Sequence, residues 1–111
     1  MSARRSALVR VRGIAAGLLE ETGAGYAFSY DPAYLAREDA VAVSLTLPLQ
    51  SGTYASPHLF AFFEGLLAEG SLRELQSRLY KIDPEDGFGL LLKTAASDVI
   101  GCVTVEPFSR E

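Results

Sequence analysis

The feature that most constrains the fold is a continuous apolar stretch, VAVSLTLPL, at residues 41 to 49. Its larger side chains recur at every second position: Val41, Val43, Leu45 and Leu47. An extended backbone directs alternate side chains to one face, so this spacing predicts a half-buried core strand. Pro48 lacks an amide proton and should end the strand or place it at a sheet edge.

An aromatic segment, Phe60 to Leu67, follows this stretch after a turn at residues 50 to 53. Its apolar residues recur at helical spacing: Leu59, Phe62, Phe63, Leu66 and Leu67. The spacing predicts the main core helix, opened by the cap-plus-proline pair Ser56-Pro57 and ended by Gly70.

The N-terminal part of the chain favours strands joined by tight turns. Gly17 weakens a helical interpretation of its segment, so we favour a strand there. The expected elements are strands over Ala7–Arg12, Ile14–Glu20 and Tyr26–Tyr30, with a turn at Thr22–Gly25 and a short helical turn over Pro32–Arg37. Asp31 should cap that helical turn, which would direct Tyr34 and Leu35 inward.

The C-terminal part predicts two helices and a closing strand. Ser71 and Glu74 form a capping box, and the following helix places Leu72, Leu75 and Leu79 on one side with Arg73 and Arg78 outside. Asp83 to Asp86 begins the next helix, whose inward residues are Phe88, Leu91, Leu92 and Ala95. Val99 to Val105 should form a strand before Pro107.

The expected fold is α+β, with a small antiparallel sheet of about five strands, partly barrel-like, against two or three helices in one domain over residues 1–111.

Composition limits the classes of function. The formal net charge of −4 disfavours direct nucleic-acid binding, and no apolar run reaches the ~20 residues of a membrane span. Cys102 has no partner for an internal disulfide, and Arg10 and Arg12 interrupt the only stretch similar to an export signal. We expect a soluble cytoplasmic protein.

The residues of a reaction centre are not recognisable in the sequence. A single histidine, His58, and a single cysteine cannot supply a zinc tetrad, and His58 has no motif that would pair it with a nucleophile. The acidic run from Asp83 to Asp86 lacks the alternation of a calcium loop and suits helix capping better. We expect no catalytic residues, no cofactor, no metal and no enzymatic activity.

Several stretches together resemble the N-terminal subdomain of the HipA family of bacterial toxin kinases. They are Phe28–Leu35, Val43–Leu49, Phe62–Gly70, and Asp86–Leu92 running into Asp98–Val103. The sequence departs from the family pattern at Ala68, where proline is favoured, at Cys102, where a small alanine is typical, and at Ala95 and Ala96, where a glycine is usual.

The resemblance implies a function by protein contact. A free-standing chain of this kind is similar to the HipS-like antitoxins, which bind and neutralise a separately encoded HipT-like serine/threonine kinase. The resemblance leaves open whether a HipB-like DNA-binding protein joins the complex. One alternative is a structural subunit that completes or scaffolds a split HipA-type kinase without inhibiting it, and an independent small enzyme has little support.

A contact function requires an exposed surface, and we expect it at the loop between the predicted strand and helix. The candidate partner-binding residues are Gln50, Thr53, Tyr54, Ser56, His58 and Glu69. The helical spacing of Phe62 and Phe63 favours the core for both of these aromatic residues.

Overall fold

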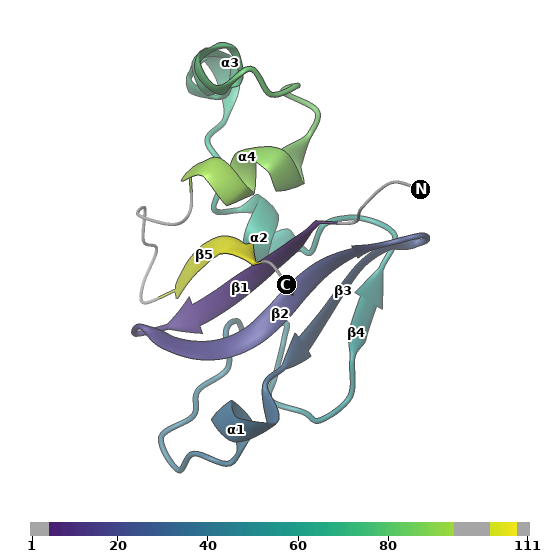
Figure 1. Cartoon of the computed structure of the whole chain (residues 1–111), viewed down its shortest axis with the longest axis vertical. Coiled ribbons are helices and arrows are strands. Elements are labelled where there is room, and N and C mark those ends of the chain that lie inside the picture. The colour runs from purple at the N-terminus through teal and green to yellow at the C-terminus, as the bar shows by residue number, and fades with distance from the viewer. Residues whose placement is uncertain (1–4, 95–102, 109–111) are drawn as a thin grey trace.

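A computed structural model describes residues 5–94 and 103–108 as an α+β fold built on one antiparallel sheet (Figure 1). The strands are β1 (Ser6–Val11), β2 (Ile14–Thr22), β3 (Gly25–Tyr30), β4 (Tyr54–Ser56) and β5 (Val103–Phe108). They lie in the order β4-β3-β2-β1-β5. The helices are α1 (Pro32–Leu35), α2 (Ala61–Glu64), α3 (Gly70–Tyr80) and α4 (Gly87–Thr94).

This architecture confirms the predicted α+β class and the antiparallel sheet of five strands. The expectation of a partly barrel-like sheet is wrong, because β4 and β5 do not pair and the sheet is open. The described residues contain four helices, two of them only four residues long, where two or three were expected.

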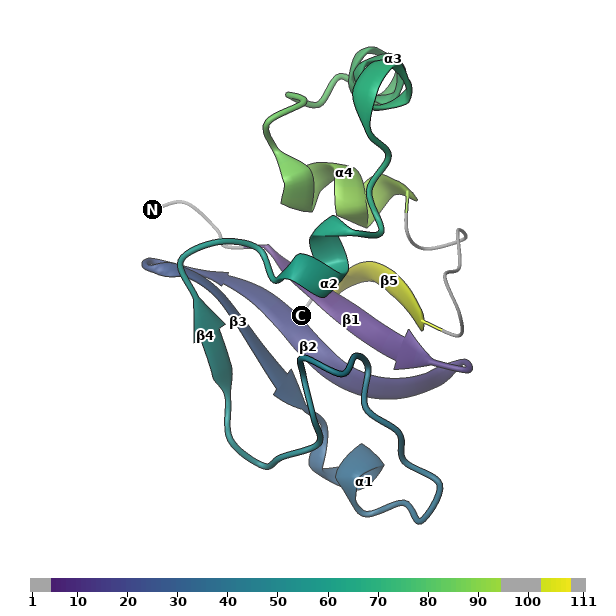
Figure 2. The same ribbon diagram turned by 180° about the vertical axis from the view of Figure 1, so that it is seen from behind.

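One face of the sheet carries the core. Along β1, Ala7, Val9 and Val11 are buried while their neighbours are half-buried, as the alternation predicted. Val9 pairs with Gly17 on one side and Val105 on the other. Helix α2 and the segment between α1 and β4 lie over this face, which is seen in Figure 2. The predicted hairpin of β2 and β3 is confirmed, and Asp31 caps α1 by accepting a hydrogen bond from the Ala33 amide at 2.9 Å.

An arginine joins α4 to the sheet. The Arg5 guanidinium donates to both carboxylate oxygens of Glu21 at the end of β2 and to both of Asp86, at 2.7 to 3.0 Å. It also lies over the Phe88 ring, 5.3 Å from its centroid. Hydrogen bonds from Arg5 lower the pKa of Glu21 and of Asp86. Asp86 also caps α4, since its Oδ1 accepts from the Gly89 amide at 3.1 Å.

The predicted core strand over Val41 to Leu49 is wrong. This segment is a loop whose only β interaction is an isolated bridge between Ser44 and Leu47. Its apolar residues do not share one face, because Val43 and Leu47 are buried whereas Val41 and Leu45 are exposed. Side-chain hydroxyls satisfy its buried backbone groups, so the segment needs no neighbouring strand.

The predicted main core helix is much shorter than expected. It is helix α2, which ends at Glu64 with Gly65 as its C-cap, and the following amides of Leu66 and Leu67 bond only three residues back. The apolar spacing still identified buried residues, since Leu59, Phe63 and Leu67 lie in the core and Phe62 packs against it. Ser56 does not cap this helix but ends a strand, β4, that the sequence did not predict.

Helix α3 begins earlier and packs differently than expected. Gly70, expected to end the preceding helix, is its first residue and has a φ of +61°, a conformation that glycine adopts without strain. Glu69 takes the N-cap position without a side-chain cap bond, so the Ser71–Glu74 capping box is wrong. The three leucines expected to face inward are exposed.

The last predicted helix and the closing strand are confirmed where the structure describes them, except that the strand does not end before Pro107. Helix α4 begins at Gly87, after the acidic run, and buries Phe88 and Leu91. The closing strand β5 runs through Pro107, which an edge strand tolerates. Ala95 and the predicted strand start at residues 99–102, with Cys102, lie outside the described residues.

Candidate docking surface

Three tyrosine hydroxyls hold the loop of residues 41–49, called here the 41–49 loop. The Tyr34 hydroxyl donates to the Val41 carbonyl at 2.8 Å and accepts from the Val41 amide at 3.1 Å. The Tyr30 hydroxyl donates to the Leu47 carbonyl and accepts from the Val43 amide at 2.9 Å. The Tyr54 hydroxyl donates to the Pro48 carbonyl at 2.6 Å. The loop is therefore fixed at both ends and in its middle by side chains from β3, α1 and β4.

The anchoring tyrosines are themselves ordered by packing. The rings of Tyr30 and Tyr34 are stacked with centroids 6.3 Å apart, and Phe28 contacts Tyr30 edge-on at 5.0 Å. Burial raises the pKa of Tyr30, so its hydroxyl stays protonated and remains a donor at neutral pH. The sequence places these rings by strand alternation and by the Asp31 cap, which orients α1.

The tip of the loop is a tight turn that exposes apolar side chains. The Leu47 amide donates to the Ser44 carbonyl at 3.0 Å, and the hydroxyls of Ser44 and Thr46 lie 3.0 Å apart. Leu45, between them, is 100% exposed, while Val41 is 45% and Leu49 39% exposed. The loop therefore presents a leucine on an ordered turn, with further apolar surface on either side.

Five of the six predicted contact residues lie directly after this loop in the sequence. Gln50, Thr53 and His58 are exposed. Tyr54 is half-buried, and its hydroxyl positions the loop. Ser56 accepts a hydrogen bond from the His58 amide at 3.1 Å. Their contact with a partner stays a prediction.

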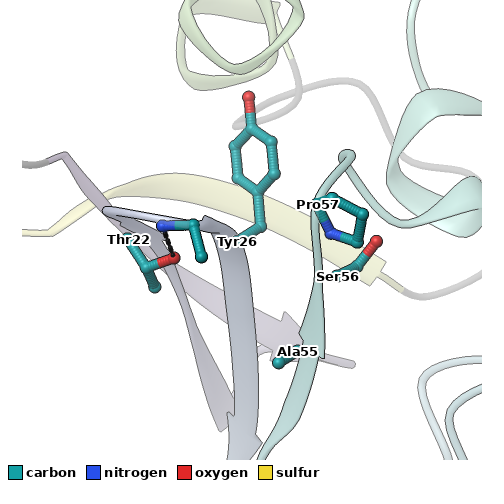
Figure 3. A pocket seen from close by; sticks show the side chains of 6 residues that line it. Thr22, Tyr26, Ala55, Ser56 and Pro57 are labelled. Carbon is teal, nitrogen blue, oxygen red and sulfur yellow. Dashed lines mark hydrogen bonds between the residues drawn. The ribbon is translucent and has the colours of Figure 1, made fainter.

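A pocket of about 310 Å³ lies at the other end of β4 (Figure 3). It is lined by Thr22, Ala24, Tyr26, Ala55, Ser56 and Pro57. A side chain at Gly25 would place its Cβ 2.2 Å from the Ser56 carbonyl oxygen, so glycine allows β4 to approach the hairpin. The lining is mostly apolar and includes one of the predicted residues, Ser56, so the pocket could accept a small apolar side chain.

Glu69 lies apart from the other predicted residues. It lines a separate pocket of about 460 Å³ between the start of α3 and the segment before α4. Its other lining residues are Glu64, Gly70, Arg73, Glu74, Pro84 and Glu85. The structure therefore divides the predicted set between two surfaces of different charge.

The exposure of Val41, Leu45 and Leu49 does not follow from the sequence pattern, because the alternation of apolar residues predicts a half-buried strand there. Ser44 and Thr46 are the signal that could have identified the turn, since short hydroxyl side chains bond to nearby backbone groups and compete with strand pairing. The Thr46 amide does bond to the Ser44 hydroxyl, at 3.2 Å.

Within residues 5–94 and 103–108, no group of three or more His, Cys, Asp or Glu side chains is arranged to hold a metal ion. In the same part of the chain, no helix is long and apolar enough to cross a membrane.

A family model and a solved structure point to the same family. The family model of the HipA N-terminal domain matches residues 7–106. An uncharacterized protein of Haemophilus influenzae is 32% identical over 102 residues, which are 92% of this chain and 92% of that protein. The solved structure of the N-terminal domain of HipA toxin is similar with a TM-score of 0.73 and 27% identity, covering 100% of this chain and 99% of that one.

Proposed function

Because the chain belongs to the HipA N-terminal domain family, we propose that it is a HipS-like antitoxin, which binds a HipT-like serine/threonine kinase and neutralises it by protein contact. The similarity is to the N-terminal domain of HipA toxin. A protein of this kind acts on the kinase from outside and needs no catalytic group of its own.

The observation that supports a contact function is the exposure of Leu45 on a turn fixed by tyrosine hydroxyls. Because the backbone of this turn is already ordered, less conformational entropy is lost when Leu45 is buried against a partner, so more of the burial energy appears as affinity. An aliphatic side chain presented in this way can act as an anchor that enters a pocket on the partner. We expect the kinase to present an apolar pocket to Leu45, and the polar residues Gln50 and Thr53 to lie at the rim of the contact.

The experiment mixes the purified protein with the HipT-like kinase encoded beside it and measures complex formation and autophosphorylation. We expect a complex by gel filtration and autophosphorylation that falls as the protein is added. No complex, together with undiminished autophosphorylation, would contradict the proposal. A complex with unchanged or increased kinase activity would favour the scaffolding subunit instead.

A substitution at the loop tip then tests the site. Leu45→Asp should weaken kinase binding at least about tenfold, because a carboxylate cannot enter an apolar pocket without losing its hydration. Phe108→Asp is the matched control, since it adds the same charge at a 39% exposed apolar position on β5, at the opposite edge of the sheet. If wild type neutralises the kinase and Leu45→Asp neutralises it equally well, the proposed function stands but the loop tip is not the binding site.

A further inference from the structure

The tip of the 41–49 loop carries two hydroxyl groups whose place beside the docking residue has a chemical consequence. Ser44 and Thr46 lie on either side of Leu45, the side chain that we expect to enter the kinase. A serine/threonine kinase transfers phosphate to hydroxyl groups of this kind when they lie on an accessible loop. The two hydroxyls differ in how the fold uses them, and the difference selects one of them.

The Ser44 hydroxyl is part of the turn itself. It accepts a hydrogen bond from the Thr46 amide at 3.2 Å, next to the backbone bond that joins the Ser44 carbonyl to the Leu47 amide at 3.0 Å. Ser44 is also half-buried. Modification of this oxygen would remove a bond that holds the turn, so Ser44 is a poor phosphate acceptor.

The Thr46 hydroxyl holds no backbone group. Thr46 is exposed, and across the described residues the one hydrogen bond of its hydroxyl is the 3.0 Å contact with the Ser44 hydroxyl. A phosphoryl group on Thr46 Oγ1 would change this side-chain contact and leave the backbone bond of the turn and the tyrosine hydroxyl bonds in place. Thr46 can therefore be modified without unfolding the loop.

A phosphate at Thr46 would enter a surface without neighbouring charges in the sequence. From Ala40 to Phe63 the chain contains no aspartate, glutamate, lysine or arginine. A phosphothreonine adds a charge of about −1.5 to −2 at neutral pH. No arginine or lysine of this segment can pair with it, so the whole of the added charge would lie beside Leu45 at the proposed contact.

That charge opposes docking. An unpaired phosphate is strongly hydrated, and moving it into an apolar contact costs its hydration. The same loop tip would therefore bind the kinase before modification and be repelled from an apolar pocket after it.

We propose that Thr46 is a phosphorylation site of the partner kinase and that its modification releases the kinase; the inference rests on the proposed function. In the transfer, Thr46 Oγ1 forms a bond to the γ-phosphorus of ATP, and the bond from that phosphorus to the β–γ bridging oxygen breaks. ADP leaves with the electron pair of that bond, and the hydroxyl proton passes to a base of the kinase. The reaction needs no reactant besides the ATP that the kinase already uses.

The test incubates the full chain with the HipT-like kinase encoded beside it, Mg²⁺, and either ATP or a non-hydrolysable ATP analogue. Mass spectrometry locates the phosphate, and the dissociation constant of the complex is measured after each incubation. We expect phosphate on Thr46 and a complex at least about tenfold weaker after ATP than after the analogue.

Matched variants separate this effect from changes in the kinase. Thr46→Val lacks the acceptor oxygen, so its binding should be the same after ATP and after the analogue. Thr46→Ser keeps a hydroxyl and should recover the response to ATP. Ser51→Ala removes another exposed hydroxyl of the uncharged segment and should respond as wild type does.

The outcomes distinguish this inference from the proposed function. A complex that forms with the analogue but carries no phosphate on Thr46 after ATP, or that is equally tight in both, would overturn the inference alone. Release by ATP that persists in Thr46→Val would overturn it as well. A protein that forms no complex with either nucleotide would contradict the proposed function, and the inference would fall with it.

Discussion

The 41–49 loop and helix α3 both expose leucines, but the protein fixes them by different means. The loop has no regular secondary structure, and tyrosine hydroxyls from β3, α1 and β4 form hydrogen bonds with its backbone. Helix α3 satisfies its own backbone and is held through two polar side chains, Arg73 and Ser77. The order of the loop therefore depends on single hydroxyl groups, whereas the order of the helix does not.

Removing the Tyr30 hydroxyl should affect the loop most. Tyr30→Phe leaves the Val43 amide and the Leu47 carbonyl, both in buried residues, without their partner, and should cost about 2–4 kcal/mol in the free energy of unfolding. Urea denaturation measures this cost. We also expect weaker kinase binding.

Tyr54→Phe is the control for this substitution. Its hydroxyl bond to Pro48 is exposed to water, so the loss should stay below about 1 kcal/mol. Equal losses in the two variants would show that burial of the Tyr30 hydroxyl is not what fixes the loop.

Removing Arg5 should instead weaken the attachment of α4 to the sheet. Arg5→Ala breaks two bidentate contacts and a cation–π contact, but the side chain is 39% exposed and its charges are partly screened. We expect a loss of about 1–2 kcal/mol and faster hydrogen exchange in α4, with little change in the 41–49 loop. Arg37→Ala, which breaks a solvent-exposed pair with Asp39, should leave the free energy of unfolding almost unchanged.

Acid should destabilise the protein through Glu21 and Asp86, the two carboxylates that are bound to Arg5. The pKa of Glu21 and of Asp86 is lowered in the folded protein, so their contribution is complete above their ordinary pKa, about 4, and is lost as the pH falls below it. The melting temperature should therefore fall on acidification, and less steeply in Arg5→Ala than in wild type. If the melting temperatures of the two proteins fell equally steeply with pH, carboxylates other than Glu21 and Asp86 would dominate acid unfolding.

Sequence periodicity predicted most of the sheet, and the reason is local. The alternation along β1 and β3 and the glycine turn between β2 and β3 specify strands and a hairpin without knowledge of distant residues. The same rule failed at the 41–49 loop, because hydroxyls 7 to 17 residues away in the sequence replaced strand partners. Contacts at that separation leave no periodic signal.

The position of the predicted contact residues has a similar cause. Five of them, at residues 50 to 58, lie beside the proposed docking loop and not on its exposed tip, and their contact with a partner stays a prediction. For α3, the spacing of Leu72, Leu75 and Leu79 correctly predicted one apolar face. Periodicity does not state whether the protein itself covers such a face, and here it does not.

The smallest effects on stability should come from the exposed leucines themselves. Leu45 makes no buried contact, so Leu45→Asp should change the free energy of unfolding by less than about 0.5 kcal/mol. Leu75→Asp should cost about 0.5–1 kcal/mol, because aspartate is a poorer helix former than leucine. Chemical denaturation measures both values. If either variant lost several kcal/mol, that leucine would contribute to the folded core and could not be reserved for a partner. If both substitutions left the free energy of unfolding almost unchanged, neither leucine would contribute to folding. Exposed apolar side chains that do not stabilise the fold are what two separate contact surfaces should show.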